Sequence, residues 1–212
     1  KNTRTVRLNG GTIEQKRQEI RDYLHKTFLL EEQLYDVIQD KQAFYLRAEA
    51  LRHPIIFYYG HTATFFINKL TLASLIQQRI NPRFESIFAV GVDEMSWDDL
   101  NEANYDWPSV TEVKAYRKKV FALVDSLIES MPLDLPVTWE SPFWPILMGI
   151  EHQRIHIETS SAIIRQMPLQ YLQQHKAWPV CPHQGEAPSN QLIEVTGGTL
   201  HLGKDRDHPT YG

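Results

Sequence analysis

The sequence predicts a mainly α-helical protein, a four-helix bundle followed by a short β segment that opens a second domain. Four long stretches place apolar residues at about the 3.6-residue period of a helix, with charged residues on the other face. Proline, serine or threonine stands at the start of these stretches, where such residues favour a helix N-terminus. No convincing pair of strands precedes residue 170, so helices must form the core by packing on one another.

The four helices are expected at residues 12–38, 54–80, 109–131 and 141–168. The first begins at Thr12, and the second begins at Pro54 and ends before Asn81-Pro82. Ser109 opens the third, and Ser141-Pro142 provides an N-cap and a first-turn proline for the fourth. Between residues 80 and 110 the pattern is irregular and predicts an ordered loop rich in tryptophan and acidic residues.

The character of the chain changes after residue 170. Residues 1–170 form the predicted metal-binding bundle, and residues 171–189 are a linker punctuated by proline. Residues 192–203 alternate in polarity around Gly197-Gly198, which predicts a β-hairpin. Because a single hairpin has no core of its own, residues 190–212 are predicted to be the truncated start of a second, β-rich domain.

Composition excludes several classes of protein. The 212 residues carry 22 basic and 26 acidic side chains, a net charge of −4, so nucleic acid is not an expected partner. The single cysteine, Cys181, allows no internal disulfide and fits a reducing compartment. No apolar run approaches the ~20 residues that span a bilayer, and no signal peptide is evident. We therefore expect a cytoplasmic protein with no membrane partner.

Two histidines in the fourth helix indicate a metal site. His152 and His156 are four residues apart, so both lie on one face of a helix and can bind one ion. That face also carries apolar residues, which directs the imidazoles into the bundle. The alternative is a structural role, but two buried imidazoles would then leave several nitrogens needing hydrogen-bond partners.

A third ligand is expected from the second helix, where His61 lies on the buried stripe between Phe57 and Phe65, beside Gly60. Three imidazoles leave further positions on an ion open, as chemistry requires. Glu158 completes an H-x3-H-x-E pattern but lies roughly 200° around the helix from His156, taking ~100° per residue. It is predicted to act in an outer shell or as a solvated carboxylate, rather than as a ligand.

Longer segments resemble a known family. The segments PIIFYYGHTATFF (54–66), FAVGVDEMSWDDL (88–100) and GIEHQRIHIE (149–158) resemble the DinB-like iron-binding domain of ovothiol-pathway 5-histidylcysteine sulfoxide synthases. The segment NQLIEVTGGTLHLGK (190–204) resembles the beginning of their sulfatase-modifying-factor domain, which is similar to formylglycine-generating enzyme. The likeness extends over nearly the whole chain.

This resemblance implies an iron-dependent oxidoreductase. In the family, non-haem Fe(II) and dioxygen join the sulfur of cysteine to an imidazole carbon of histidine, giving a sulfoxide. The family's three iron ligands correspond to His61, His152 and His156. The resemblance also implies that the bundle packs against its own C-terminal domain, which contributes a catalytic tyrosine. The 212 residues alone are therefore expected to bind Fe(II) and to show little activity.

Two other functions remain open from the sequence. DinB-like bundles also resemble metal-dependent thiol transferases, which bind Zn or Ni through three histidines. The linker and the segment after it favour the sulfoxide synthase, because a standalone transferase would not need them. The other alternative is a non-catalytic interaction module that keeps a metal site. Stoichiometric metal without a change on adding dioxygen or thiol would favour this module.

Overall fold

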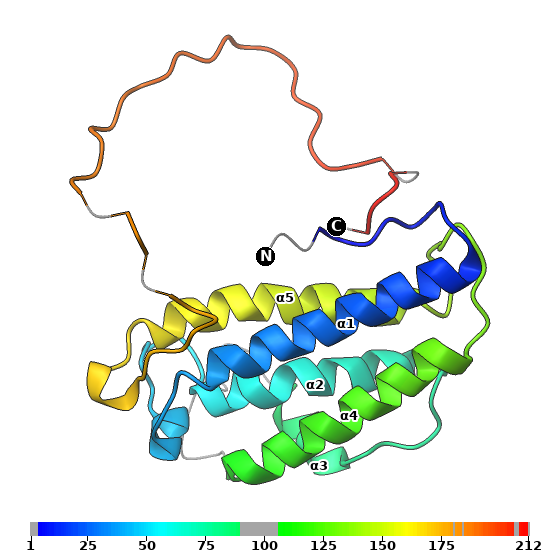
Figure 1. The fold of residues 1–212 in the computed structure, drawn as a ribbon, viewed down its shortest axis with the longest axis horizontal. Helices are drawn as coiled ribbons and strands as arrows, with labels where there is room; N and C mark the ends of the chain where they lie inside the picture. The colour runs from blue at the N-terminus through cyan, green and yellow to red at the C-terminus, as the bar shows by residue number, and fades with distance from the viewer. Residues whose placement is uncertain (1–3, 90–105, 180, 184, 206–207, 212) are drawn as a thin grey trace.

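A computed structural model describes residues 4–89, 106–179, 181–183, 185–205 and 208–211. Its α-helices are α1 (Ile13–Tyr35), α2 (Ile55–Leu72), α3 (Pro82–Ile87), α4 (Val110–Ser130) and α5 (Trp144–Ile164). Two short 3-10 helices, η1 (Lys41–Tyr45) and η4 (Leu169–Tyr171), complete the regular structure of the described residues. The predicted helical bundle is confirmed (Figure 1).

The four long helices surround one apolar core. Helix α2 packs against α5 and α4, and α1 packs against the same two helices. The short α3 packs on α2 beside α4. Buried residues of all four long helices fill the centre, among them Ile20, Ile56, Ile67, Val113, Val124 and Ile146. Such an arrangement holds side chains of α2 and α5 against each other along the length of the bundle.

Local sequence signals set two of the helix starts. Thr12 and Gln15 form a capping box at α1. The backbone N–H of Gln15 donates to Thr12 Oγ1 at 3.2 Å, and the backbone N–H of Thr12 donates to Gln15 Oε1 at 2.9 Å. Ser109 and Glu112 repeat this pattern at α4. Both starts agree with the sequence prediction, because a capping box satisfies backbone N–H groups that the first turn leaves free.

Four predicted helix boundaries are wrong by three residues or more, including the end of α1 at Tyr35, not 38, and the end of α5 at Ile164, not 168. Helix α2 ends at Leu72, not near residue 80, because Ser74 adopts a left-handed conformation with φ of 58° that a helix cannot continue. Helix α5 begins at Trp144, not at Ser141, and Pro145 is the proline of its first turn. Of the loop predicted between residues 80 and 110, α3 occupies the beginning, and residues 90–105 lie outside the described residues.

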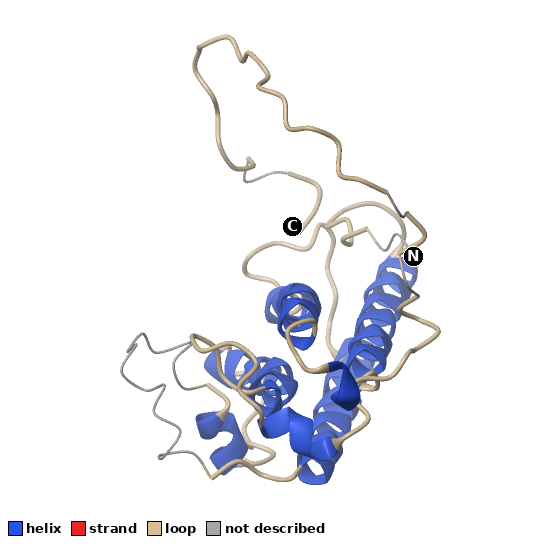
Figure 2. Ribbon diagram, turned by 90° about the vertical axis from the view of Figure 1, so that its left-hand side faces the viewer, coloured by secondary structure: helices blue, strands red, loops and turns tan. Residues whose placement is uncertain are grey.

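The predicted hairpin at residues 192–203 is also wrong. The described residues of this segment form no strand, and Leu192, Ile193 and Leu202 are 85–104% exposed. The segment arcs away from the bundle (Figures 1 and 2). An isolated hairpin is marginal in water without a surface to cover its apolar face. The described residues after 190 contain no strand and only an isolated β-bridge at Thr210, whereas the domain boundaries near residues 170 and 190 stay predictions.

The last described residues return to the start of the chain. The Leu8 amide donates to the Pro209 carbonyl at 2.8 Å, and Arg7 and Thr210 form an isolated antiparallel bridge. The Tyr211 ring lies 4.6 Å from the ring of Trp144 at the beginning of α5. The first and last described segments thus lie side by side, next to the beginning of α5 (Figure 1). Among the described helices, none combines the length and apolar character needed to cross a membrane.

Candidate metal site

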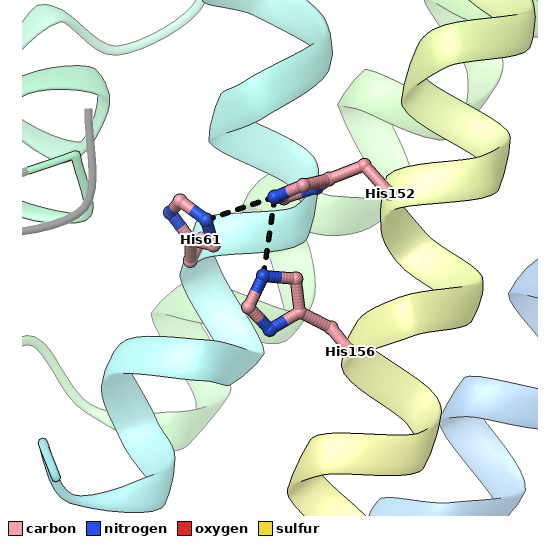
Figure 3. A group of neighbouring side chains, drawn as sticks. All are labelled: His61, His152 and His156. Atoms are coloured by element: carbon pink, nitrogen blue, oxygen red, sulfur yellow. Dashed lines mark hydrogen bonds between the residues drawn. The ribbon is translucent and has the colours of Figure 1, made fainter. Parts of the chain in front are cut away.

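Three histidine side chains from two helices converge inside the bundle. His61 extends from α2, and His152 and His156 extend from α5 (Figure 3). The Nε2 atom of His152 lies 3.1 Å from Nε2 of His61 and 3.1 Å from Nε2 of His156. One ligand atom from each of the three lies within 4.8 Å of the other two. His61 is fully buried, whereas the two α5 histidines are half-buried.

Two glycines allow the elements around these histidines to approach closely. A Cβ atom added to Gly149 of α5 would overlap the ring of Phe66 on α2. A Cβ atom added to Gly60 would overlap the ring of Phe88, which follows α3. Gly149 lies one turn before His152, and Gly60 directly precedes His61. Gly149 therefore lets the ligand-bearing turns of α5 and α2 approach closely, and Gly60 lets Phe88 approach the turn that carries His61.

Phe88 also orients His61. The Nδ1–H group of His61 donates to the Phe88 carbonyl oxygen at 2.6 Å. A carbonyl oxygen only accepts, so Nδ1 carries a hydrogen, and in the neutral ring the lone pair is then on Nε2. The ring of Phe57, one turn earlier on α2, stacks on His61 at 5.2 Å. The hydrogen bond to the Phe88 carbonyl thus fixes the tautomer of His61, and it directs Nε2 toward the other histidines.

The two α5 histidines lie against aromatic rings and are held neutral. Phe65 stacks on His152 with ring centres 3.7 Å apart, and Tyr58 lies 5.8 Å from His156. Burial, followed by the neighbouring histidines, lowers the pKa of His152 to about 2. Burial and the nearby His61 lower the pKa of His156 to about 3. Near neutral pH the rings therefore offer lone pairs rather than positive charge.

These atoms fit the requirements of a divalent metal ion. An imidazole nitrogen binds such an ion at about 2.0–2.2 Å, so two ligands on one ion are at most about 4.4 Å apart. Two of the three Nε2 separations, both 3.1 Å, already meet this limit. Within the described part of the chain, the buried Nδ1 atoms of His152 and His156 have no hydrogen-bond partner. The facing Nε2 atoms can share hydrogen bonds, but each ring nitrogen carries at most one hydrogen, so these bonds cannot satisfy all three nitrogens as a shared cation would.

The structure brings together all three predicted ligands and leaves Glu158 apart from them. Glu158 is exposed on α5, in agreement with the angular argument that it faces away from His152 and His156. A role for its carboxylate in an outer shell stays a prediction. The structure does show a hydrogen bond from His61 to the carbonyl oxygen of Phe88. Sequence patterns do not identify this contact, because every residue has a backbone carbonyl.

Sequence reasoning also missed a buried polar network beside the site. Arg117 of α4 is 1% exposed, and its guanidinium contacts Glu31 of α1 at 2.6 Å. Gln153, next to His152, donates to the same Glu31 oxygen at 2.6 Å. A signal was present, because Arg117 and Glu31 each stand on the apolar stripe of a helix. Charged residues are rarely buried unless they are paired. Each of these two residues therefore indicates a partner of opposite charge, but the sequence does not say which residue that partner is.

The comparisons with known proteins agree with this architecture. A sequence model described as the DinB superfamily matches residues 13–160, more than half of the chain. This range begins with α1 and includes all three histidines. The search of curated proteins found no match.

Proposed function

Because the chain belongs to the DinB superfamily, which includes metal-dependent enzymes, we propose that it is a non-haem Fe(II) sulfoxide synthase. In this proposal the enzyme uses dioxygen to join the sulfur of cysteine to an imidazole carbon of histidine, a step of ovothiol biosynthesis. The family membership supports only metal dependence. The specific reaction rests on the resemblance of residues 54–66 and 149–158 to the iron-binding domain of such synthases.

One observation carries the proposal: three imidazole nitrogens converge from two helices, with the α5 histidines neutral and half-buried. Three protein ligands are typical of a catalytic site, since a structural site usually closes the ion with four. Imidazole binds Fe(II), Zn(II) and Ni(II) alike, so the choice of Fe(II) follows the resemblance and not the donor atoms. A bound Fe(II) would supply open positions for a thiolate and dioxygen and would lower the pKa of the thiol.

The proposed reaction balances without another reductant. Cysteine loses the hydrogen of its thiol, and histidine loses the hydrogen of one ring carbon as the carbon–sulfur bond forms. One oxygen atom of dioxygen becomes the sulfoxide oxygen, and the other leaves as water with the two hydrogens. Dioxygen accepts four electrons, two from forming the bond and two from oxidising the sulfur.

The residues of this chain have separate parts in that chemistry. His61, His152 and His156 would hold the ion, and the Phe88 carbonyl keeps the Nε2 lone pair of His61 directed at it. The rings of Phe57 and Phe65 cover His61 and His152 and limit the access of water to them. We propose that the groups that bind cysteine and histidine lie partly in a C-terminal domain that packs against the bundle in the cytoplasmic enzyme.

Product analysis tests this function. The chain is loaded anaerobically with Fe(II), mixed with cysteine and histidine, and exposed to dioxygen, and products are identified by mass spectrometry. We expect stoichiometric iron and little product from residues 1–212, but the histidyl-cysteine sulfoxide from a chain extended through the following domain. Thiol conjugation with Zn(II) or Ni(II) and no consumption of dioxygen would instead identify a thiol transferase. Stoichiometric metal with no reaction in the extended chain would identify a non-catalytic module.

A further inference from the structure

The buried guanidinium of Arg117 links α4 to two other helices of the bundle, α1 and α2. Its Nε atom donates to Glu32 at 2.7 Å and its Nη2 atom donates to Glu31 at 2.6 Å, both on α1. Its Nη1 atom donates to the Tyr59 carbonyl oxygen at 2.7 Å and to Thr62 Oγ1 at 2.8 Å, both on α2. A guanidinium is planar and rigid, so these partners fix one orientation of the three helices.

Glu31 connects Arg117 to α5 through a second hydrogen bond. The Oε2 atom of Glu31 accepts from Arg117 and also from Gln153 Nε2, each at 2.6 Å. Glu31 is fully buried and Gln153 is 2% exposed. Hydrogen bonds to a charged group inside a protein are short, strong and directional. Apolar contacts along the same helices tolerate small shifts more readily, so the network limits movement of α5 along and around its axis.

The contacts of this network lie beside the three histidines in sequence. Tyr59 and Thr62 lie on either side of His61 on α2, and Gln153 lies between His152 and His156 on α5. The two helices that carry the histidines are thus joined, through Arg117 and Glu31, at the turns from which the histidines extend. The rings that cover the site are hydrocarbon surfaces and supply no such directional link.

We propose that Arg117, Glu31 and Gln153 are positioning residues of the histidine site, which hold α2 and α5 so that three Nε2 atoms stay within reach of one ion. This inference rests on the proposed function only in that the site binds a metal. It does not depend on which reaction follows. Designed sites that lack such support are commonly loose by about 1 Å, which is enough to weaken binding.

Co(II) binding to the 212-residue chain tests the proposal, because the absorption spectrum of Co(II) reports its coordination. Gln153→Leu removes the link to α5 but keeps the side-chain volume and the Arg117–Glu31 pair. Arg117→Lys keeps the charge, but a single ammonium cannot contact α1 and α2 in the same geometry. For both variants we expect Co(II) affinity to fall about 10- to 100-fold, as for outer-shell changes at metal sites, with an altered spectrum in the protein that remains folded.

Ser160→Ala is the matched control. Ser160 is fully buried on α5 and its hydroxyl pairs with Tyr35 of α1 at 3.2 Å, so the variant loses an α1–α5 hydrogen bond outside the network. We expect it to bind Co(II) like the wild type. Wild-type affinity and spectrum in both network variants would overturn the proposal, as would an equal loss of affinity in Ser160→Ala. A wild-type chain that binds no Co(II) would overturn the proposed function itself and this inference with it.

Discussion

The bundle contains two polar clusters that differ in charge and in what completes them. In the histidine cluster, burial lowers the pKa of His152 and His156 and keeps both rings neutral, and Nε2 of His152 lies 3.1 Å from Nε2 of each other histidine. The Arg117 cluster is charged, and each guanidinium nitrogen has a protein partner within 2.8 Å. The first cluster has room on its facing nitrogens for an added cation, whereas the second already contains its counter-charges. We therefore expect changes in the Arg117 cluster to lower stability the most, and changes in the histidine cluster to lower metal affinity the most.

The largest expected effect is on folding. Arg117→Met removes the cation from a buried pair and leaves the carboxylate of Glu31 without its counter-charge. Breaking a buried pair in this way typically lowers the free energy of unfolding by about 3–5 kcal/mol. Denaturant unfolding of the metal-free protein measures it. Arg83→Met is the control, because Arg83 is exposed and pairs with an exposed Asp106, a kind of contact worth about 0–1 kcal/mol. Equal stabilities of the two variants would contradict a structural role for the Arg117 cluster.

The next effect is on metal binding. His152→Ala removes the ring that lies within 3.1 Å of both other histidines. We expect Fe(II) affinity to fall by more than about 100-fold, beyond the usual loss from outer-shell changes. The metal-free protein should lose less stability than Arg117→Met does, because no charge is left unpaired. Anaerobic titration and denaturant unfolding measure the two effects, with exposed His25→Ala as the control.

The difference between these clusters also explains what the sequence could predict. The histidine positions follow from helical spacing and apolar stripes, which are local properties of the chain. The capping residues Thr12 and Ser109 are equally local. The pairing of Arg117 with Glu31 depends on how α4 packs on α1, which no local pattern specifies. The prediction of a hairpin at residues 192–203 was wrong for a related reason. An alternation of polar and apolar residues indicates a strand only where another surface covers the apolar side.

A smaller effect is expected where α2 and α5 approach most closely. Gly149→Ala places a methyl group against the Phe66 ring, and overpacking of this kind typically costs about 1–3 kcal/mol. Since Gly149 lies one turn before His152, metal affinity should also fall. Gly198→Ala is the control, because nothing lies within 4 Å of a Cβ atom there. Thermal unfolding and Fe(II) titration check both expectations, and a Gly149→Ala variant as stable as Gly198→Ala would show that the helices need no such close approach.

The smallest effect is expected at Glu158. The side chain is exposed on α5, and exposed substitutions usually change stability by no more than about 0.5 kcal/mol. Glu158→Gln should therefore bind Fe(II) with nearly wild-type affinity, or with at most the ~10- to 100-fold loss of an outer-shell change. Metal analysis after gel filtration measures this. If Glu158→Gln loses its metal as completely as His152→Ala, the assignment of three histidine ligands is wrong.

The central claim is that a single ion is shared by two helices, and His61 tests it most directly because it is the ligand that α2 contributes. The measurement is an anaerobic Fe(II) titration of the wild type and of His61→Ala by calorimetry. We predict one ion per wild-type chain and a loss of affinity of more than about 100-fold in the variant, as for His152→Ala. Binding of one ion by His61→Ala with wild-type affinity would show that the α5 histidines bind metal without α2, and would contradict the account.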